Sequence, residues 1–188
     1  MEPIELLKEE HKNIKKVLVV IRKLCIKVFN TGNVDYKAFT DVIDFVRNYA
    51  DEHHHGKEED ILFDMISKSL DDDLEKNPVE AMFSEHDLGR YFINNLETAL
   101  DKVKDGEENA RIDVIANSIA YADLLDGHIY KEDNIIYSYG QEKLSSKDLT
   151  ELEERAIEVE TNAQEKGIQE KYLNLINELK SKVENINL

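Results

Sequence analysis

The 188-residue sequence has few of the residues that interrupt helices, with seven glycines and two prolines. Both prolines stand where a helix can begin, Pro3 near the start of the chain and Pro78 directly after Asn77. Proline is tolerated in the first turn of a helix because its missing N–H is unpaired there anyway. This composition predicts an all-α fold.

The sequence also has little cysteine and no long apolar run. The single cysteine, Cys25, excludes an internal disulfide, and the lack of cysteine ligands argues against a zinc finger or an iron–sulfur cluster. Its spacing from Ile21 and Val28 indicates a packed core residue. No apolar run approaches the roughly 18 residues that cross a bilayer, and the first residues, MEPIELLKEEHK, are acidic and unlike a signal peptide. We therefore expect a cytoplasmic protein that has no membrane partner.

Basic residues are outnumbered, with 24 lysines and arginines against 41 aspartates and glutamates, for a formal charge of −17. The acids are spread along the chain, which disfavours nucleic acid and anionic lipid as partners. An apolar content of 41% in this length is enough for one domain with one core.

Apolar residues recur at helical spacing in four segments joined by short connections, which we place at residues 3–28, 35–69, 78–104 and 110–139. Four long helices with short connections predict an antiparallel up-down four-helix bundle, over residues 1–144. Residues 145–188 are expected to form a helical extension packed on the bundle within the same domain. A capping sequence from Ser145 to Asp148 opens this extension, and Gly167 divides it into two helices.

Histidine is scarce, with six residues, yet two separate segments each contain a histidine–glutamate pair four positions apart that we take as metal ligands. These pairs are His54 with Glu58 and His128 with Glu132. Residues i and i+4 of a helix point the same way, so an imidazole and a carboxylate can converge on one cation. His11 and His86 each interrupt an apolar helical stripe at a position that normally holds leucine or isoleucine.

In an antiparallel bundle, residues equally distant from a shared loop lie at the same depth. Counting along the helices places His11 near the level of His54, and His86 at the level of His128. One by one, these histidines also fit hydrogen-bonded core residues. Together with two glutamates that would be costly to bury without a cation, they predict a dinuclear metal site. Mixed imidazole and carboxylate ligands favour iron or another first-row transition metal, and zinc or another divalent metal is a possible substitute.

His53 and His55 lie about 100° of helix rotation to either side of His54, so at most one of them is expected to face the site. We favour His55 as a fifth imidazole and interpret His53 as part of a partly exposed run. Glu59 forms a competing pair with His55 and is expected to face outward or to orient a ligand. Three further acids are candidates to orient ligands by hydrogen bonds: Glu85, Asp87 and Asp133. Gly89 either makes room for a small ligand or serves helix packing.

Four sequence segments, EEHKNI, HHHGKEEDILF, SEHDLGR and GHIYKEDNIIY, resemble in order and spacing the ligand-bearing segments of the bacterial hemerythrin-like family, the HHE cation-binding domains. Residues 145–188 resemble the extension of longer members. The resemblance implies a non-heme di-iron site capped by four histidines and bridged by two glutamates: His11, His54, His86, His128, Glu58 and Glu132. Oxygen-carrying members would have a histidine at Arg90, so the resemblance does not imply reversible oxygen carriage. In the fourth helix we favour Glu132 over Asp133 as the ligand, because position i+4 faces the metal better than i+5.

The leading functional hypothesis is a di-iron protein that binds or reacts with oxygen, nitric oxide or peroxide in redox or nitrosative stress. Alternatives are an iron sensor or store read out by the C-terminal helices, an iron–sulfur cluster repair protein, and a bundle that the metal merely stabilises. The pattern leaves open whether the site is catalytic, and it identifies no protein partner.

Overall fold

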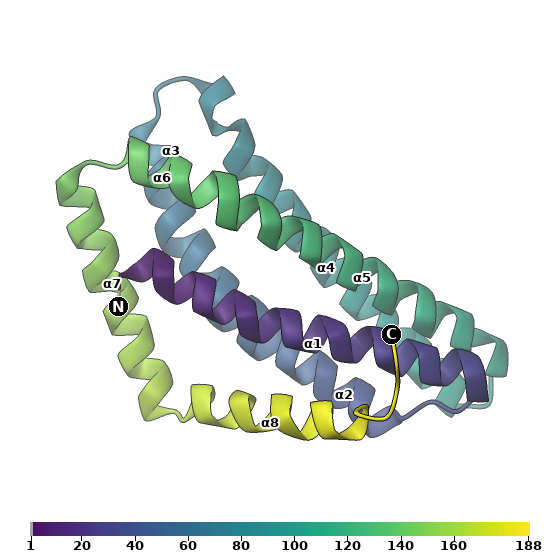
Figure 1. The fold of residues 1–188 in the computed structure, drawn as a ribbon. Helices are drawn as coiled ribbons and strands as arrows, with labels where there is room; N and C mark the ends of the chain where they lie inside the picture. The colour runs from purple at the N-terminus through teal and green to yellow at the C-terminus, as the bar shows by residue number, and fades with distance from the viewer. Residues whose placement is uncertain (1) are drawn as a thin grey trace.

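The computed structural model of the chain describes residues 2–188, apart from the side chain of Asp73, and contains helices and no strand within that range. Four antiparallel rods form the bundle (Figure 1). The first is α1 (Pro3–Thr31), and the second joins α2 (Tyr36–Phe45), η1 (Val46–His55), η2 (Glu58–Phe63) and α3 (Asp64–Ser69). The third is α4 (Asp73–Lys104), and a short 3₁₀ turn, η3 (Glu108–Ala110), leads to the fourth, which joins α5 (Arg111–Lys131), η4 (Glu132–Ile136) and α6 (Tyr137–Lys143). The predicted all-α bundle is confirmed.

The first rod is one turn longer than predicted. Helix α1 continues past Val28 to Thr31 and ends where Gly32 takes a left-handed conformation with φ of 70°. The Gly32 N–H donates to the carbonyl of Val28 at 2.8 Å, which closes the last turn.

The third rod begins five residues before the predicted start at Pro78. Asp72 is its N-cap and accepts a hydrogen bond from the N–H of Leu74, so Pro78 lies inside the helix. Proline there removes the hydrogen bond to the carbonyl four residues earlier, which belongs to Leu74. Because Leu74 is exposed, water can hydrate that carbonyl, and the helix tolerates the proline.

Three segments of the second and fourth rods are π-helical, with i→i+5 hydrogen bonds in place of i→i+4: η1, η2 and η4. Such turns are rare and cluster at functional sites. A wider turn separates successive residues by a smaller angle and shifts the buried face along the sequence. The apolar spacing of Leu125, His128 and Glu132 predicts Ile135 as the next buried residue. The wider turn displaces the buried face instead, because Ile135 is 55% exposed whereas Ile136 and Tyr137 are buried.

The core consists of two apolar clusters separated by a polar layer. The larger cluster lies towards the α1–α2 loop and includes Leu24, Phe39 and Leu96. The smaller lies at the opposite end of the bundle and includes Leu62 and Ile66. The histidines and glutamates of the predicted site occupy the layer between them, where apolar packing on both sides fixes the rods around the polar groups.

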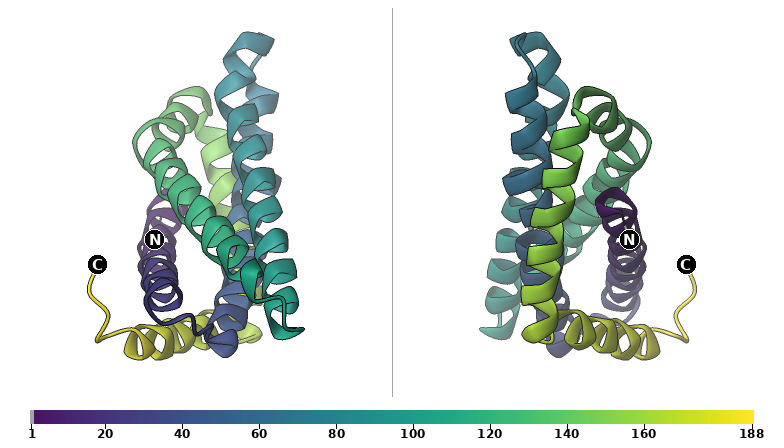
Figure 2. Two further views of the ribbon diagram at one scale, coloured as in Figure 1. Left: turned by 90° about the vertical axis from the view of Figure 1, so that its right-hand side faces the viewer. Right: turned by 90° about the vertical axis from the view of Figure 1, so that its left-hand side faces the viewer.

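The C-terminal extension covers one side and one end of the bundle (Figures 1 and 2). Helix α7 (Ser146–Glu165) opens with the predicted capping box of Ser145 and Asp148 and packs against α1 and η2. Gly167, with φ of 68°, turns the chain into α8 (Ile168–Lys182), which packs against α1 and α2. Over residues 2–188, no helix combines the length and apolar character that crossing a membrane requires.

Candidate metal centre

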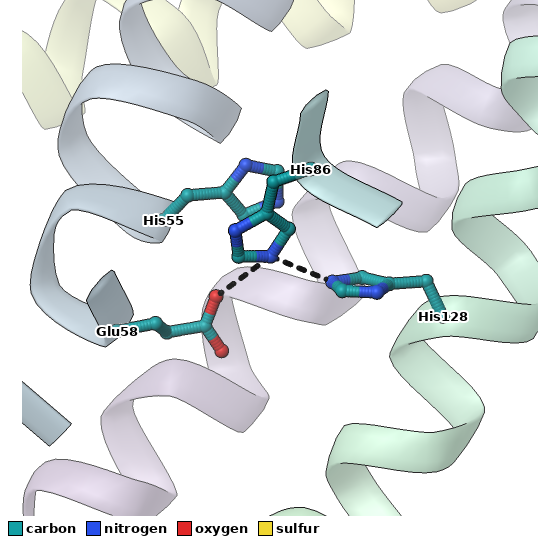
Figure 3. Close-up of side chains that lie close together, drawn as sticks. All are labelled: His55, Glu58, His86 and His128. Carbon is teal, nitrogen blue, oxygen red and sulfur yellow. Dashed lines mark hydrogen bonds and ion pairs between the residues drawn. The ribbon is translucent and has the colours of Figure 1, made fainter. Parts of the chain in front are cut away.

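Five imidazoles and two carboxylates from all four rods converge in the polar layer, in two groups that share Glu58. The three-histidine side consists of His55, His86 and His128 with Glu58 (Figure 3). The two-histidine side consists of His11 and His54 with Glu58 and Glu132. Within each group the potential ligand atoms lie within 4.8 Å of one another, which is compatible with one cation per group. All seven side chains predicted as metal ligands are therefore brought together and buried.

Glutamate oxygens lie between the two groups. Glu58 Oε2 is 3.6 Å from His54 Nε2 on one side and 3.7 Å from His86 Nε2 on the other. Glu132 Oε2 is 3.3 Å from His11 Nε2, while its Oε1 is 2.9 Å from His128 Nε2. The counting argument for depth is confirmed, since the His11 and His54 rings are 4.5 Å apart and the facing Nε2 atoms of His86 and His128 are 2.9 Å apart. Each glutamate is thus placed to bridge two ions.

The π-helical segment η1 explains why two neighbouring histidines reach the centre. On a regular α-helix His54 and His55 would diverge by about 100°, but the wider turn lets both point inward. His55 stacks on His86 with ring centroids 3.7 Å apart. It supplies the third imidazole of that side, whereas Arg90 forms ion pairs outside the centre with Asp51, Glu59 and Asp87.

Every imidazole of the centre turns its Nδ1 to a carboxylate and leaves Nε2 for the interior. The five Nδ1 contacts are His11 with Asp133 at 2.8 Å, His54 with Glu10 at 2.8 Å, His55 with Asp51 at 3.3 Å, His86 with Glu59 at 2.6 Å and His128 with Glu85 at 2.9 Å. Such carboxylate partners fix the tautomer and the ring orientation of metal-bound histidines. The arrangement fits Nε2 ligation throughout.

Three of the acids that sequence proposed as orienting groups occupy these positions: Glu59, Glu85 and Asp133. Asp87 does not, and that prediction is wrong. It lies on the exposed face of α4, with 77% of its side chain accessible, and pairs with Arg90. Asp87 directly follows His86, and the rotation of the helix between successive residues turns its side chain away from the bundle interior.

His53 is buried, so the interpretation of a partly exposed residue is wrong. Helix α7 covers it, and its Nε2 lies 3.0 Å from Glu10 Oε1 and 3.3 Å from Glu160 Oε1. Lys57, only 3% exposed, donates to both carboxylates. We call these four residues the lysine network: Glu10, His53, Lys57 and Glu160. Since Glu10 also contacts His54, the network connects α7 to the two-histidine side.

The pKa shifts at the centre differ between its histidines: at His86 burial is outweighed by hydrogen bonds to Glu132 and Glu59, which raise its pKa to about 9, whereas burial dominates at His54 and His55. Burial, together with the negative charge of Glu132, raises the pKa of Glu58 well above its usual value. Burial lowers the pKa of His54 to about 4, with a further contribution from His11. Burial and the neighbouring His86 likewise lower the pKa of His55. Neutral imidazoles are the form that binds metal.

Four buried atoms at the centre have no hydrogen-bond partner: His54 Nε2, Glu58 Oε2 and both carboxylate oxygens of Glu132. The short approach of His128 to Glu132 is not aligned as a hydrogen bond. Buried polar atoms left unpaired cost about 1–3 kcal/mol each, and more when charged. Two divalent cations would satisfy all four atoms, so the donor set fits a pair of metal ions.

Three residues at the centre were not anticipated: Tyr137, Glu10 and Asp51, the last of which contacts His55 Nδ1. Tyr137 donates to Glu58 Oε1 at 2.5 Å and lies 3.3 Å from His11 Nε2. It was missed because η4 shifts the buried face by one position. The burial of Glu10 could have been predicted from the sequence, because this residue precedes Ile14 and Val17 by four and seven residues and so falls on an apolar face of α1.

A cavity of about 330 Å³ leads to the three-histidine side. It is enclosed by η1, α4 and α5, with His55 and His86 at its buried end and Arg47 and Asn94 near the surface. Gly89 lines it and also faces the ring of Tyr121, 3.6 Å from where a Cβ would lie, so both of its predicted roles remain open. The two-histidine side instead lies against the lysine network and Tyr137.

Comparison with protein families matches residues 2–139 to the family described as hemerythrin HHE cation binding domain. Neither the curated proteins nor the solved structures that were compared gave a match. The matched range contains every histidine and glutamate of the two groups and ends before α7. The chain, with its buried histidine and glutamate cluster in a helical bundle, therefore belongs to the hemerythrin HHE cation-binding family.

Proposed function

We propose that this protein holds two iron ions at the buried centre and binds or reacts with a small molecule, namely oxygen, nitric oxide or peroxide, in redox or nitrosative stress. The observation that carries the proposal is the pair of ligand groups sharing Glu58, with a cavity leading to one of them. Imidazole and carboxylate donors without thiolates suit non-heme iron. Iron bound there would supply reversible electron transfer or direct binding of the small molecule.

The residues of the chain have separable roles in this proposal. His55, His86 and His128 would hold one ion, His11 and His54 the other, and Glu58 and Glu132 would bridge them. The five carboxylates on the Nδ1 atoms hold the rings in place. Tyr137, by donating to Glu58, fixes the conformation of one bridging carboxylate. The apolar clusters above and below limit the access of water to the centre.

Anaerobic iron loading followed by metal analysis and optical spectroscopy tests the proposal. We expect two irons per chain and a visible spectrum that changes on adding oxygen, nitric oxide or hydrogen peroxide. A protein that binds two irons but shows no spectral change with any of the three would refute the reactive function.

A second function, an iron sensor, is favoured by the lysine network. Glu160 of α7 contacts Lys57 and His53, which contact Glu10, the partner of His54. Metal bound at the two-histidine side would therefore affect the packing of α7 on the bundle. Limited proteolysis of residues 145–188 with and without iron tests this function. Protection by iron supports the sensor, and Glu160→Gln should reduce that protection, whereas identical digestion contradicts it.

A further inference from the structure

Basic residues are concentrated on one helix of this acidic chain. Residues 11–31, which lie within α1, contain five lysines, one arginine and no aspartate or glutamate, although the whole chain carries a formal charge of −17. Four of these lysines are exposed or half-exposed at spacings of three, four or seven residues: Lys12, Lys15, Lys16 and Lys23. Residues at these spacings share one face of a helix. The outer face of α1 is therefore positively charged over about three turns.

A groove of about 450 Å³ lies beside this face, between α1 and the end of α8, which pack against each other (Figure 1). Its lining includes the buried side chains of Val20 and Val183, and Val19, which is 43% exposed. The charged residues of the lining are three lysines and one glutamate: Lys16, Lys23, Lys180 and Glu184. We call the following five lysines the basic face: Lys12, Lys15, Lys16, Lys23 and Lys180. Together with the groove, this face combines positive charge with apolar surface, as protein-binding surfaces do.

Three lysines of the basic face, Lys16, Lys23 and Lys180, form no ion pair with the acids that the structure describes. Lys16 donates to an asparagine side chain at 2.9 Å, and Lys23 donates to a backbone carbonyl at 3.5 Å. By contrast, Arg22 of the same helix pairs with Asp123. The three ammonium groups can therefore contact carboxylates of another molecule without breaking an ion pair of this chain.

The basic face adjoins the two-histidine side of the centre. His11 also belongs to α1, and its Nδ1 lies 2.8 Å from Asp133 Oδ1. Asp133 Oδ2 lies 3.6 Å from Lys15 Nζ, and 24% of the Asp133 side chain is exposed. One imidazole and one carboxylate thus connect the surface at Lys15 with the interior of the centre. None of the residues that line the cavity at the three-histidine side belongs to α1, so a protein bound to the basic face leaves that cavity open.

From these observations we propose that the basic face is the docking site of a small acidic electron-transfer protein. The inference deepens the proposed function and rests on it for the destination of the electron. One electron leaves the reduced flavin or iron–sulfur cluster of the partner and converts one iron(III) at the centre to iron(II), with no atom or proton transferred. Charge complementarity favours this partner, because the basic face attracts an acidic protein that a chain of charge −17 otherwise repels. Complexes of electron-transfer proteins are small and weak, which agrees with a face of five lysines around one exposed valine.

Zinc-loaded full-length protein tests the docking, because zinc is redox-inactive. The probe is an oxidised plant-type ferredoxin, a small acidic iron–sulfur protein. Calorimetric titration at an ionic strength of about 20 mM should show saturable binding that weakens about tenfold or more at about 200 mM, because salt screens the attraction between charged surfaces. Amide NMR signals of Lys16 and Val19 should shift or broaden. Absence of saturable binding at low salt, or signal changes that leave α1 unaffected, would overturn the inference.

Two double variants locate the binding. Lys16→Glu with Lys180→Glu reverses two charges of the basic face and should weaken ferredoxin binding by about tenfold or more. Lys23 is kept, because it bonds a backbone carbonyl. Lys102→Glu with Lys147→Glu changes two exposed lysines of α4 and α7 by the same total charge. This matched control should weaken binding by less than about threefold. Equal weakening in the two double variants would overturn the assignment to the basic face.

Two further measurements examine other occupants of the basic face. Sedimentation of the free zinc protein should give the same coefficient for the wild type and for Lys16→Glu with Lys180→Glu. Self-association that this double variant abolishes would assign the face to a second copy of the chain and overturn the inference. A single-stranded DNA oligonucleotide should bind more weakly than ferredoxin, and tighter binding would assign the face to nucleic acid.

Iron(III)-loaded protein separates this inference from the proposed function. Reduced ferredoxin should convert its spectrum to that of the iron(II) form, about tenfold or more slowly in Lys16→Glu with Lys180→Glu. Ferredoxin that binds without reducing the iron would overturn the inference. Binding and reduction, together with an iron(II) form inert to oxygen, nitric oxide and peroxide, would support the docking and refute the reaction. A reactive iron protein whose zinc form binds no ferredoxin would do the reverse.

Discussion

The two sides of the buried centre share Glu58 but differ in their surroundings. The three-histidine side borders a cavity that reaches the surface between η1, α4 and α5. The two-histidine side borders the lysine network, with α7 packed over it, and Tyr137. The difference indicates that one side is accessible to small molecules from the surface, whereas the other is connected to the C-terminal extension.

Removing the carboxylate of Glu58, which both sides share, should affect both sides and produce the largest loss of bound metal. Glu58→Ala takes a ligand from both sides, so we expect loss of about half of the bound metal and most of the reactivity. Elemental analysis and optical spectra of the iron-loaded protein measure this. Glu52→Ala, which changes an exposed acid on the same rod, is the control and should be unaffected. Full metal occupancy in Glu58→Ala would contradict the ligand assignment.

Removing one imidazole should affect only one side. His55→Ala leaves two imidazoles on the three-histidine side, so we expect metal affinity there to fall by at least tenfold while the other side stays occupied. His53, two residues before His55, provides the matched comparison, because His53→Ala should keep the full metal content. Metal titration followed by competition with a chelator measures both variants. Equal losses in the two would show that His55 has no special role.

Removing the buried cation of the lysine network should act on stability. Lys57→Ala leaves the buried carboxylate of Glu10 and the partly exposed carboxylate of Glu160 without their lysine, a change that costs about 3–5 kcal/mol. This corresponds to a fall of about 10 °C in the melting temperature of a chain of this size.

A control variant and a test of rescue by zinc accompany the Lys57→Ala experiment. Lys37→Ala breaks an ion pair with Asp41 whose lysine is exposed, and it should leave the melting temperature close to that of the wild type. Glu10, His53 and Glu160 can themselves surround a cation, so zinc should restore more stability to Lys57→Ala than it adds to the wild type. A melting temperature equal to that of the wild type without zinc would refute the role of the network.

The smallest effect is expected from the tyrosine on the two-histidine side. Tyr137→Phe removes one hydrogen bond to Glu58, worth about 1.5–3 kcal/mol because the acceptor is a carboxylate. Metal content should stay at two ions, with a shifted visible spectrum and a melting temperature lower by a few degrees. A spectrum identical to that of the wild type would show that Tyr137 does not influence the metal centre.

Most of the fold could be predicted from apolar spacing. The seam of α1, from Leu7 to Val28, and that of α4, from Met82 to Val103, are buried as predicted. The helix ends were predicted less accurately. Asp72 caps the start of the third rod earlier than Pro78 suggested, and Gly32 caps the end of the first rod later than the predicted end at Val28. Capping depends on backbone conformation, which sequence spacing does not report.

The sequence by itself determined the six core ligand candidates, because histidines and glutamates on otherwise apolar helical stripes must meet in the interior of an antiparallel bundle. Only the tertiary structure decided that His55 joins them, that Tyr137 replaces the predicted stripe position, and that His53 lies buried under α7. The physical reason is that π-helical turns change the angle between successive residues, and that contacts such as Lys57 with Glu160 join segments more than a hundred residues apart. A helical repeat read from the sequence contains neither piece of information.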